Sequence, residues 1–286
     1  MKKKYYSKEL MATIFYISAL EDGKLRVTHG RYLHSCFFTL MGNVSPELAT
    51  KLHKSNQERP FTVSTLYPCK NIHFKPDKYN QMITIRKGEK YWFRITGMTA
   101  EICDVINQIC GNNKPMIRID TVSFDIFQTD QKKHSRAGSF KYEDIGNFLN
   151  HPPPHTYSLQ FISPTAFHSR NQNIVFPMPV LVFPRLLKRW NRFCPEKWQI
   201  SEDLTHDQFE EWVMVSGYKL QTHSLDFGPK GRELTFSGYC EYKASRNAPF
   251  RVKQILHVLL RFSFFAGIGY GTPKGMGQVD FLTFNR

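Results

Sequence analysis

A glycine-rich segment near the C-terminus has the composition of a phosphate-binding loop. Residues 265–279 read FAGIGYGTPKGMGQV, with five glycines and one lysine. Glycines let a backbone approach a ligand closely, and exposed N–H groups beside a lysine can hold phosphate oxygens. The cations of the preceding expected helix favour such a ligand, and the alternative is a tight glycine turn that binds nothing. The residues concerned are Gly267, Gly269, Gly271, Lys274, Gly275 and Gly277, with Arg251, Lys253 and Arg261 in the helix.

The loop does not match the common nucleotide-binding signatures. Neither G-x-G-x-x-G nor G-x-x-x-x-G-K-[ST] occurs in it. It also follows an expected helix and precedes an expected strand, which is the reverse of the order in a dinucleotide site. A phosphate bound here would therefore belong to another kind of ligand.

The overall charge indicates which ligand. The chain has 286 residues, with 39 Lys and Arg against 24 Asp and Glu, which gives a formal net charge of +15. Such an excess is typical of proteins that bind a polyanion, either nucleic acid or an acidic membrane. The sequence has no basic amphipathic helix with a bulky exposed apolar face, so we favour nucleic acid.

Composition excludes several other classes. Hydrophobic residues make up 41% of the chain, which is enough for a packed core and excludes global disorder. The longest apolar segments, 174–183 and 255–265, are interrupted and too short to cross a bilayer. The N-terminus is too polar for a signal peptide, so we expect a cytosolic protein. The six cysteines form no CxxC pair. We expect reduced thiols, no metal site and no cofactor.

The pattern of the first half predicts an α+β unit. Thr99–Cys110 is the clearest helix, because its apolar residues recur on one face. Ser45 and Pro46 suit the start of a short helix. The order strand, helices, strands, helix, strand is a split βαβ pattern. The expected strands are 11–18, 61–66, 82–86 paired with 90–96, and 116–127; the helices are 29–41, the one opening at 45, and 99–110.

The second half repeats this order after a proline-rich break at 151–155. We place the domain boundary there, with a helix expected in 139–150 before it. No identity between the halves is visible, so the duplication rests on element order alone. The expected strands are 157–162, 218–227 paired with 233–242, and 277–284; the helices are 180–193, 207–215 and 251–265.

Three blocks carry a family resemblance. The run LLRFSFFAGIGYGTPKGMGQVD ends the chain's last expected helix and contains the glycine loop. It resembles the C-terminal signature of the CRISPR-associated repeat-processing endoribonucleases, members of the RAMP superfamily. Two further blocks agree with it, Phe161–Phe167 with Leu187–Asn191, and Glu47–His53 with Pro60–Ser64.

The resemblance implies both a fold and an activity. The fold is two tandem ferredoxin-like (RRM-like) domains, which we place at 1–150 and 151–286. The activity is metal-independent cleavage of CRISPR repeat RNA (pre-crRNA) into guide RNAs. In such a reaction the ribose 2′-OH attacks the adjacent phosphate, leaving a 5′-OH and a 2′,3′-cyclic phosphate. The protein must supply a base, an acid and cations for the developing charge.

His53 is the first candidate for the acid or base. In the resemblance, a histidine of the Leu-Ala-x-x-Leu-His stretch has that role in several members. His53 follows Leu52 by about 100° on the helix, which places it at the edge of the buried stripe. The alternative is a surface histidine whose cationic form suits a helix C-terminus.

The supporting groups are Arg31, His34 and Arg59. Arg31 could hold the scissile phosphate, and its alternative is a solvated arginine at a helix start. His34 is either a second acid or base, or a half-buried structural histidine. Arg59 stands where some members have a lysine, and otherwise holds a carboxylate in a turn. Phe38 occupies the position at which some members have a tyrosine.

RNA binding is expected over a wider surface. Trp190 and Tyr270 are candidates for base stacking, and the alternative for Trp190 is a place in the core. Binding should weaken steeply with salt if several phosphates are neutralised. Besides the glycine loop and the segment 185–192, the expected RNA-binding residues are Lys132, Lys133, Arg136, Arg170, Arg246, Arg251 and Lys253.

The sequence is compatible with two functions. The first is the endoribonuclease, with CRISPR repeat RNA and processed crRNA as partners. The second is a non-cleaving subunit that holds guide RNA in a CRISPR effector complex, and Phe38 keeps this alternative open. Either protein could be a monomer or a homodimer, with no membrane partner.

Overall fold

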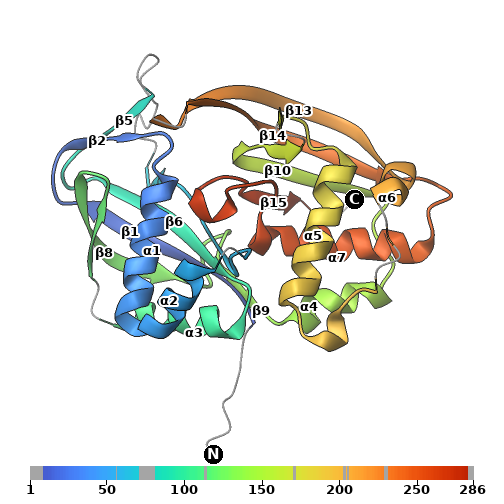
Figure 1. Cartoon of the computed structure of the whole chain (residues 1–286), viewed down its shortest axis with the longest axis horizontal. Helices are drawn as coiled ribbons and strands as arrows, with labels where there is room; N and C mark the ends of the chain where they lie inside the picture. Colours follow the sequence, from blue (N-terminus) through green and yellow to red (C-terminus); the bar gives the residue numbers. More distant parts are fainter. Residues whose placement is uncertain are drawn as a thin grey trace, which may run out of the picture. The chain divides into compact units, whose positions relative to one another are not determined.

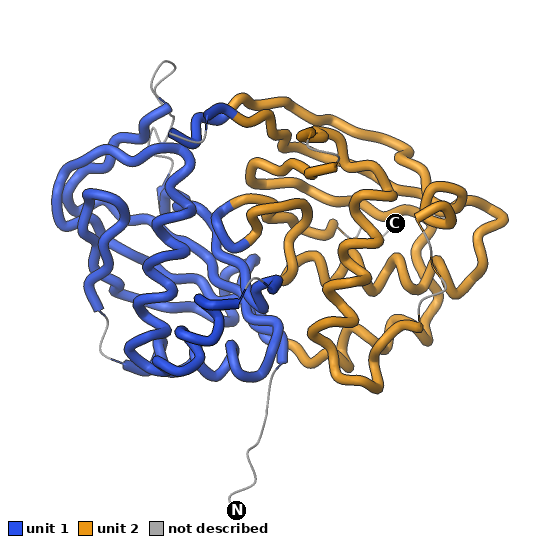
Figure 2. Tube along the Cα trace, viewed as in Figure 1, with its two compact units in different colours: residues 1–139, 225–232, 273–275 blue, residues 140–224, 233–272, 276–286 orange. Residues whose placement is uncertain are grey.

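The computed structural model describes residues 9–55, 57–70, 81–112, 115–169, 172–201, 204, 206–228 and 231–282. The chain forms two compact units (Figure 2). Unit 1 comprises residues 1–139, 225–232 and 273–275, and unit 2 comprises the rest. Within the described ranges, no helix combines the length and apolar composition needed to span a bilayer.

Unit 1 contains an antiparallel sheet with three helices on one face (Figure 1). The main strand order is β3-β6-β1-β8-β7; in addition, β4 pairs with β6, and β9 (Gly138–Phe140) pairs with β1. A separate two-stranded sheet is formed by β2 and β5. The strands are β1 (Leu10–Ala19), β2 (Gly23–Arg26), β3 (Phe61–Val63), β4 (Tyr67–Pro68), β5 (Met82–Ile85), β6 (Lys90–Gly97), β7 (Met116–Ile119) and β8 (Val122–Asp130); the helices are α1 (Gly30–Val44), α2 (Pro46–Lys54) and α3 (Ala100–Gly111).

Alternation along the strands creates the core of unit 1. Phe15 and Phe93 lie opposite each other on β1 and β6, and their rings stack 5.2 Å apart. They belong to one buried cluster with Phe37 of α1 and Ile106 of α3. The apolar face predicted for 99–110 is therefore confirmed. Thr99 caps this helix by accepting a hydrogen bond from the N–H of Ile102.

Unit 2 contains a four-stranded sheet in the order β13-β14-β10-β15, and α7 packs on β10 and β15. Helix α5 packs in turn on α7. The strands are β10 (Thr156–Thr165), β11 (Phe167–Ser169), β12 (Gln172–Ile174), β13 (Val213–Asp226), β14 (Arg232–Ala244) and β15 (Val279–Leu282); the helices are α4 (Tyr142–Gly146), α5 (Pro179–Phe193), α6 (His206–Trp212) and α7 (Phe250–Ala266).

The two sheets share one topology. The four main strands of unit 1 are, in chain order, β1, β3, β6 and β8. Across the sheet they lie in the order β3-β6-β1-β8, so that the second strand in the chain is followed by the third, the first and the fourth. Strands β10, β13, β14 and β15 of unit 2 have the same order. This is the ferredoxin-like βαββαβ arrangement in both units. The duplication expected from element order is thus confirmed by strand pairing.

Several boundaries differ from the sequence prediction. Residues 82–86 and 90–96 are not partners, because β5 pairs with β2 while β6 pairs with β1 and β3. The strand expected over 116–127 is a hairpin of β7 and β8, which turns at Asp120 with a positive φ of 55°. The helix expected over 207–215 ends at Trp212, where the long β13 begins.

The division between units also lies earlier than residue 150. Residues 140–150 group with unit 2, so the boundary falls after Ser139. The reason is aromatic packing: the ring of Tyr142 lies 5.1 Å from that of Trp190 and 6.1 Å from that of Phe262. The proline-rich segment at 151–155 is a connection inside unit 2.

Candidate functional site

The start of α1 is held by a buried histidine. Nδ1 of His29 donates to the carbonyl oxygen of Arg26 at 2.7 Å, and Nε2 accepts the N–H of Leu66 at 2.8 Å. Both ring nitrogens are thus used by a neutral imidazole. Burial lowers the pKa of His29 to about 4, which keeps it neutral at physiological pH. The first turn of α1 is therefore fixed against the segment that follows β3.

His34 is anchored one turn further along α1. Its Nδ1 lies 3.1 Å from the carbonyl oxygen of Pro273. Its ring lies 4.9 Å from that of Phe38 and 5.7 Å from that of Phe61. Burial, and then the charge of Lys274, lower the pKa of His34 to about 4. The hydrogen bond to Pro273 places the proton of the neutral ring on Nδ1 and makes Nε2 the acceptor.

Phe38 is the centre around which the predicted catalytic residues gather. The ring of His53 lies 5.9 Å from that of Phe38, and the guanidinium carbon of Arg59 lies 6.0 Å from it. His53 is exposed in the last turn of α2. Arg59 donates to the carbonyl oxygen of Ser55 at 2.7 Å, which fixes the chain just after that helix. The structure therefore brings His34, His53 and Arg59 together although they come from three parts of the sequence.

Arg31 lies on the same face of α1 as His34 and Phe38. Its guanidinium donates to the hydroxyl of Tyr32 at 3.0 Å and to the carbonyl oxygen of Phe227 at 3.5 Å. The side chain is half-buried rather than fully solvated. It thus presents a held cation one turn before His34.

The end of the glycine loop packs beside α1. The N–H of Gly275 donates to the carbonyl oxygen of Val63 at 2.9 Å, and Gly275 forms a parallel bridge with Ser64. A Cβ on Gly30 would lie 2.7 Å from the Cα of Gly275, so this contact requires glycine. Lys274 remains exposed next to His34, which explains its effect on the pKa of that residue.

The other loop glycines are required by packing within unit 2. Gly267, Gly269 and Gly277 have φ of 67°, 86° and 65°. The space that a Cβ would take at each is filled by a carbonyl oxygen of the chain itself. Close approach of a ligand is therefore not needed to explain these glycines. Binding of RNA by Gly267, Gly269, Gly271, Gly275 and Gly277 stays a prediction.

Arg189 holds this loop, a role that the sequence analysis missed. It was grouped with the basic segment 185–192 as a site for phosphate, but its side chain is only 8% exposed. Its guanidinium donates to the carbonyl oxygen of Ala266 and to the hydroxyl of Thr272, the latter at 3.1 Å. Trp190 beside it is fully buried, as expected of a core residue.

The basic residues of α7 do not flank the glycine loop. Arg251 and Lys253 lie in the first turn, about 24 Å and about 21 Å from Gly267 at the usual rise of a helix. Arg251 donates to the carbonyl oxygen of Leu149 at 3.2 Å, and Lys253 to that of Arg246 at 3.4 Å. The expectation that these cations support the loop is wrong, because they stand at the opposite end of the helix.

Arg261, the third cation of that helix, is used within the fold. Its Nε donates to Nε2 of His257 at 2.8 Å, and its guanidinium carbon lies 4.0 Å from the ring centre of Phe148. The remaining predicted cations are spread over both units. Lys132, Lys133 and Arg246 are exposed, Arg136 is only 8% exposed, and Arg170 lies outside the described residues.

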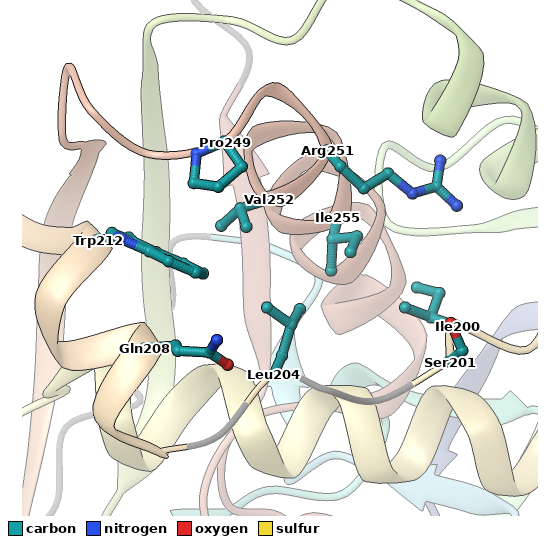
Figure 3. Close-up of a pocket in the computed structure, with 9 residues that line it drawn as sticks. All are labelled: Ile200, Ser201, Leu204, Gln208, Trp212, Pro249, Arg251, Val252 and Ile255. Carbon is teal, nitrogen blue, oxygen red and sulfur yellow. The ribbon is translucent and has the colours of Figure 1, made fainter.

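A cavity of about 250 Å³ lies in unit 2, at the start of α7 (Figure 3). The side chains of Leu204, Trp212, Val252 and Ile255 converge on it, whereas the guanidinium of Arg251 points away. This lining is mostly apolar, although Ser201 and Gln208 also contribute to it. In the described part of the chain, no group of three or more His, Cys, Asp or Glu is arranged to hold a metal ion.

The two units and the site at α1 define a tandem ferredoxin-like protein with a glycine-rich C-terminal loop. Comparison with known families agrees with this class. Residues 12–144 match the CRISPR Cas6 N-terminal domain, and residues 159–279 match the CRISPR-associated endoribonuclease Cas6. The chain belongs to the Cas6 family.

Individual relatives support the same assignment. The CRISPR-associated endoribonuclease Cas6 of Streptococcus thermophilus is 28% identical over 123 residues. This alignment covers 43% of the present chain and about half (49%) of that protein.

Solved structures show the fold. A Thermus thermophilus Cas6 superposes with a TM-score of 0.69 at 22% identity, covering 96% of this chain and 99% of the other. A Cas6 product complex gives a TM-score of 0.72 at 23% identity, covering 96% and 100%.

Proposed function

We propose that this protein is a metal-independent endoribonuclease that cuts CRISPR repeat RNA into guide RNAs. The observation that carries this proposal is the cluster of His34, His53 and Arg59 around Phe38, with Arg31 and Lys274 beside it. Two imidazoles and three cations on one unit are the groups that phosphodiester cleavage by an internal 2′-OH requires. Membership of the Cas6 family supports the same substrate.

The site divides the proton transfers between two histidines. His34 is neutral at pH 7 because its pKa is lowered to about 4, so its Nε2 can take the proton of the 2′-OH. The 2′-oxygen then bonds to phosphorus, and the bond from phosphorus to the 5′-oxygen breaks. His53 gives a proton to that leaving oxygen. The products are a 2′,3′-cyclic phosphate and a 5′-OH.

The cations stabilise the charge that develops on the phosphoryl oxygens. The guanidinium of Arg31 is already held by Tyr32 and Phe227, so it needs little reorganisation on binding. The charges of Lys274 and Arg59 both act on His34. Each of these groups acts from unit 1.

The test is cleavage of repeat RNA in excess EDTA by wild type, His34→Ala and His53→Ala. Each substitution should lower the cleavage rate by about 10²–10⁴-fold, the usual contribution of a general acid or base, while RNA binding persists. His155→Ala is the matched control, because this histidine is exposed and lies in unit 2. Loss of cleavage in EDTA that added metal restores would contradict metal independence.

A second function is favoured by one observation. The ring of Phe38 lies 4.9 Å from the imidazole of His34 and 5.9 Å from that of His53, so it contacts both. A subunit that holds guide RNA without cutting it could tolerate this ring. Tight binding of repeat RNA with no cleavage by wild type would support that function and contradict the endoribonuclease.

A further inference from the structure

Three aromatic side chains form a row across the sheet of unit 1. Tyr67 of β4 pairs with Trp92 of β6, and Trp92 pairs with Tyr16 of β1. Residues directly paired in a sheet lie on the same face. The rings of Tyr67 and Trp92 stack 4.4 Å apart with an interplanar angle of 21°. All three side chains are partly exposed, and we call them the aromatic row.

The aromatic row lies on the sheet face that the helices do not cover. Phe15 and Phe93, next along the strands from Tyr16 and Trp92, belong to the buried cluster with α1 and α3. Because successive side chains of a strand point to opposite faces, Tyr16 and Trp92 point away from that cluster. The row is therefore not part of the core that holds the helices.

Cations surround the aromatic row. The guanidinium carbon of Arg136 lies 5.5 Å from the ring of Tyr67 and 5.8 Å from that of Trp92. The Lys90 ammonium lies 5.0 Å from the ring centre of Phe127, whose ring is 6.2 Å from that of Tyr16. This face thus combines flat apolar surfaces with positive charge.

The loop after β8 adds two exposed lysines in a fixed conformation. The carboxylate of Asp130 accepts the N–H groups of Lys132, Lys133 and His134 at 2.7–3.0 Å. Burial raises the pKa of Asp130, but these donors and the charge of His134 lower it overall. The ring of His134 in turn lies 4.7 Å from that of Trp92. Lys132 and Lys133 are thereby presented next to the aromatic row.

Unit 2 shows that the fold itself does not require such a row. In its sheet, Gln160 of β10 is paired with Asp280 of β15 on one side and with Tyr239 of β14 on the other. The hydroxyl of Tyr239 bonds to Ser158 and donates to the carboxylate of Glu241, so this row is polar and carries acids. Two sheets of the same topology therefore differ in chemistry on the same face.

We infer that the aromatic row binds a single-stranded segment of the repeat RNA outside the cut. Bases stack on Trp92, Tyr67 and Tyr16, and Lys90, Lys132 and Lys133 bind the phosphates. Proteins bind single-stranded nucleic acid by combining positive charge with aromatic side chains on which bases stack, and stacking accepts any base. The positive charge selects RNA over an apolar peptide. This inference rests on the proposed function for its substrate.

The test is binding of a fluorescein-labelled octauridylate, followed by fluorescence anisotropy. Trp92→Ala should weaken binding by about five- to hundred-fold, the range that one base–aromatic stack supplies, and Trp92→Phe should restore most of it. Tyr239→Ala is the matched control, since it removes an aromatic residue from the polar row of unit 2. Replacing Lys132 and Lys133 together by alanine should lower the slope of log K against log salt by about 1.4.

Equal binding by wild type and Trp92→Ala, with both proteins folded by circular dichroism, would overturn the inference. A loss that is the same in Trp92→Ala and Tyr239→Ala would also overturn it. Cleavage of repeat RNA is measured in parallel on the same proteins. If the protein cleaves repeat RNA but its binding of octauridylate does not depend on Trp92, the proposed function stands and the role of the aromatic row is rejected. If binding depends on Trp92 but the protein does not cleave repeat RNA, the role of the aromatic row stands and the proposed function is rejected.

Discussion

Nδ1 of His34 lies 3.1 Å from the carbonyl oxygen of Pro273, a residue 239 positions later in the chain. This hydrogen bond orients the imidazole and sets its tautomer, because the carbonyl accepts only from a protonated Nδ1. The next residue, Lys274, lowers the pKa of the same histidine. The end of the glycine loop therefore both positions and tunes a side chain of α1.

The pH dependence of cleavage should report this arrangement. If His34 is the base, the acid limb of the kcat/KM profile lies near pH 4, because that parameter reports the free enzyme. Lys274→Met removes a cation that disfavours the protonated ring, so the limb should move to higher pH. The move stays partial, since burial is the larger cause.

The measurement is kcat/KM between pH 3.5 and 8 for wild type and Lys274→Met. Lys24→Met serves as the control, because that lysine is exposed on β2 and has no place in the site. An acid limb near pH 6.5 in all three proteins would show that His34 is not the base.

Gly275→Ala should disrupt the site through packing as well as backbone conformation. Gly275 has φ of 93°, and a Cβ there would lie 2.8 Å from Cγ2 of Thr65 and 3.0 Å from the Cα of Gly30. Gly88 has a similar φ of 80° but open space around it, so Gly88→Ala isolates the backbone cost. We expect that cost to be about 1 kcal/mol and Gly275→Ala to lose about 3 kcal/mol of unfolding free energy.

Urea unfolding of the two glycine variants measures this difference. Gly275→Ala should also slow cleavage, because Lys274 and Pro273 would shift relative to His34. Equal losses of stability in both variants would show that the contact between Gly275 and Gly30 contributes nothing.

The sequence predicts more of the fold than of the candidate site. The helix at 99–110 follows from a regular apolar stripe, and the element order gave both α+β units. The pairing of β5 with β2 could not be predicted, because periodicity places a strand but does not choose its partner. Likewise, no local pattern connects His34 to Pro273 or distinguishes buried Arg189 from its exposed neighbours Lys188 and Arg192. These depend on contacts between distant segments.

The buried His29 should make stability depend on pH. Its folded pKa is lowered to about 4, below the 6.5 of an unfolded chain. As the pH falls below 6.5, His29 is protonated in the unfolded state but stays neutral in the folded state, so the free energy of unfolding falls. The loss accumulates down to about pH 4, at up to about 1.4 kcal/mol per pH unit from this residue.

Comparison of wild type with His29→Gln at pH 7.5, 5.5 and 4.5 tests this. At pH 7.5 the variant should be less stable by about 2 kcal/mol, since Arg26 and Leu66 lose a shared partner. The difference should narrow by pH 5.5 and vanish or reverse by pH 4.5, because wild type loses about 1.4 kcal/mol per pH unit below 6.5 and glutamine does not titrate. A gap that stays constant with pH would mean that His29 becomes protonated inside the fold.

Arg189 and Arg192 separate a structural arginine from a solvated one on the same helix. Arg189→Met removes the hydrogen bonds that Arg189 donates to the buried oxygens of Ala266 and Thr272. This should lower the free energy of unfolding by about 2–3 kcal/mol. Arg192→Met, at an exposed position, should change stability by less than about 0.5 kcal/mol. The salt dependence of RNA binding gives a second, independent readout. If Arg189 acts by holding the glycine loop, its loss weakens binding without changing the salt slope; a slope reduced by about 0.7 would instead make it a phosphate ligand.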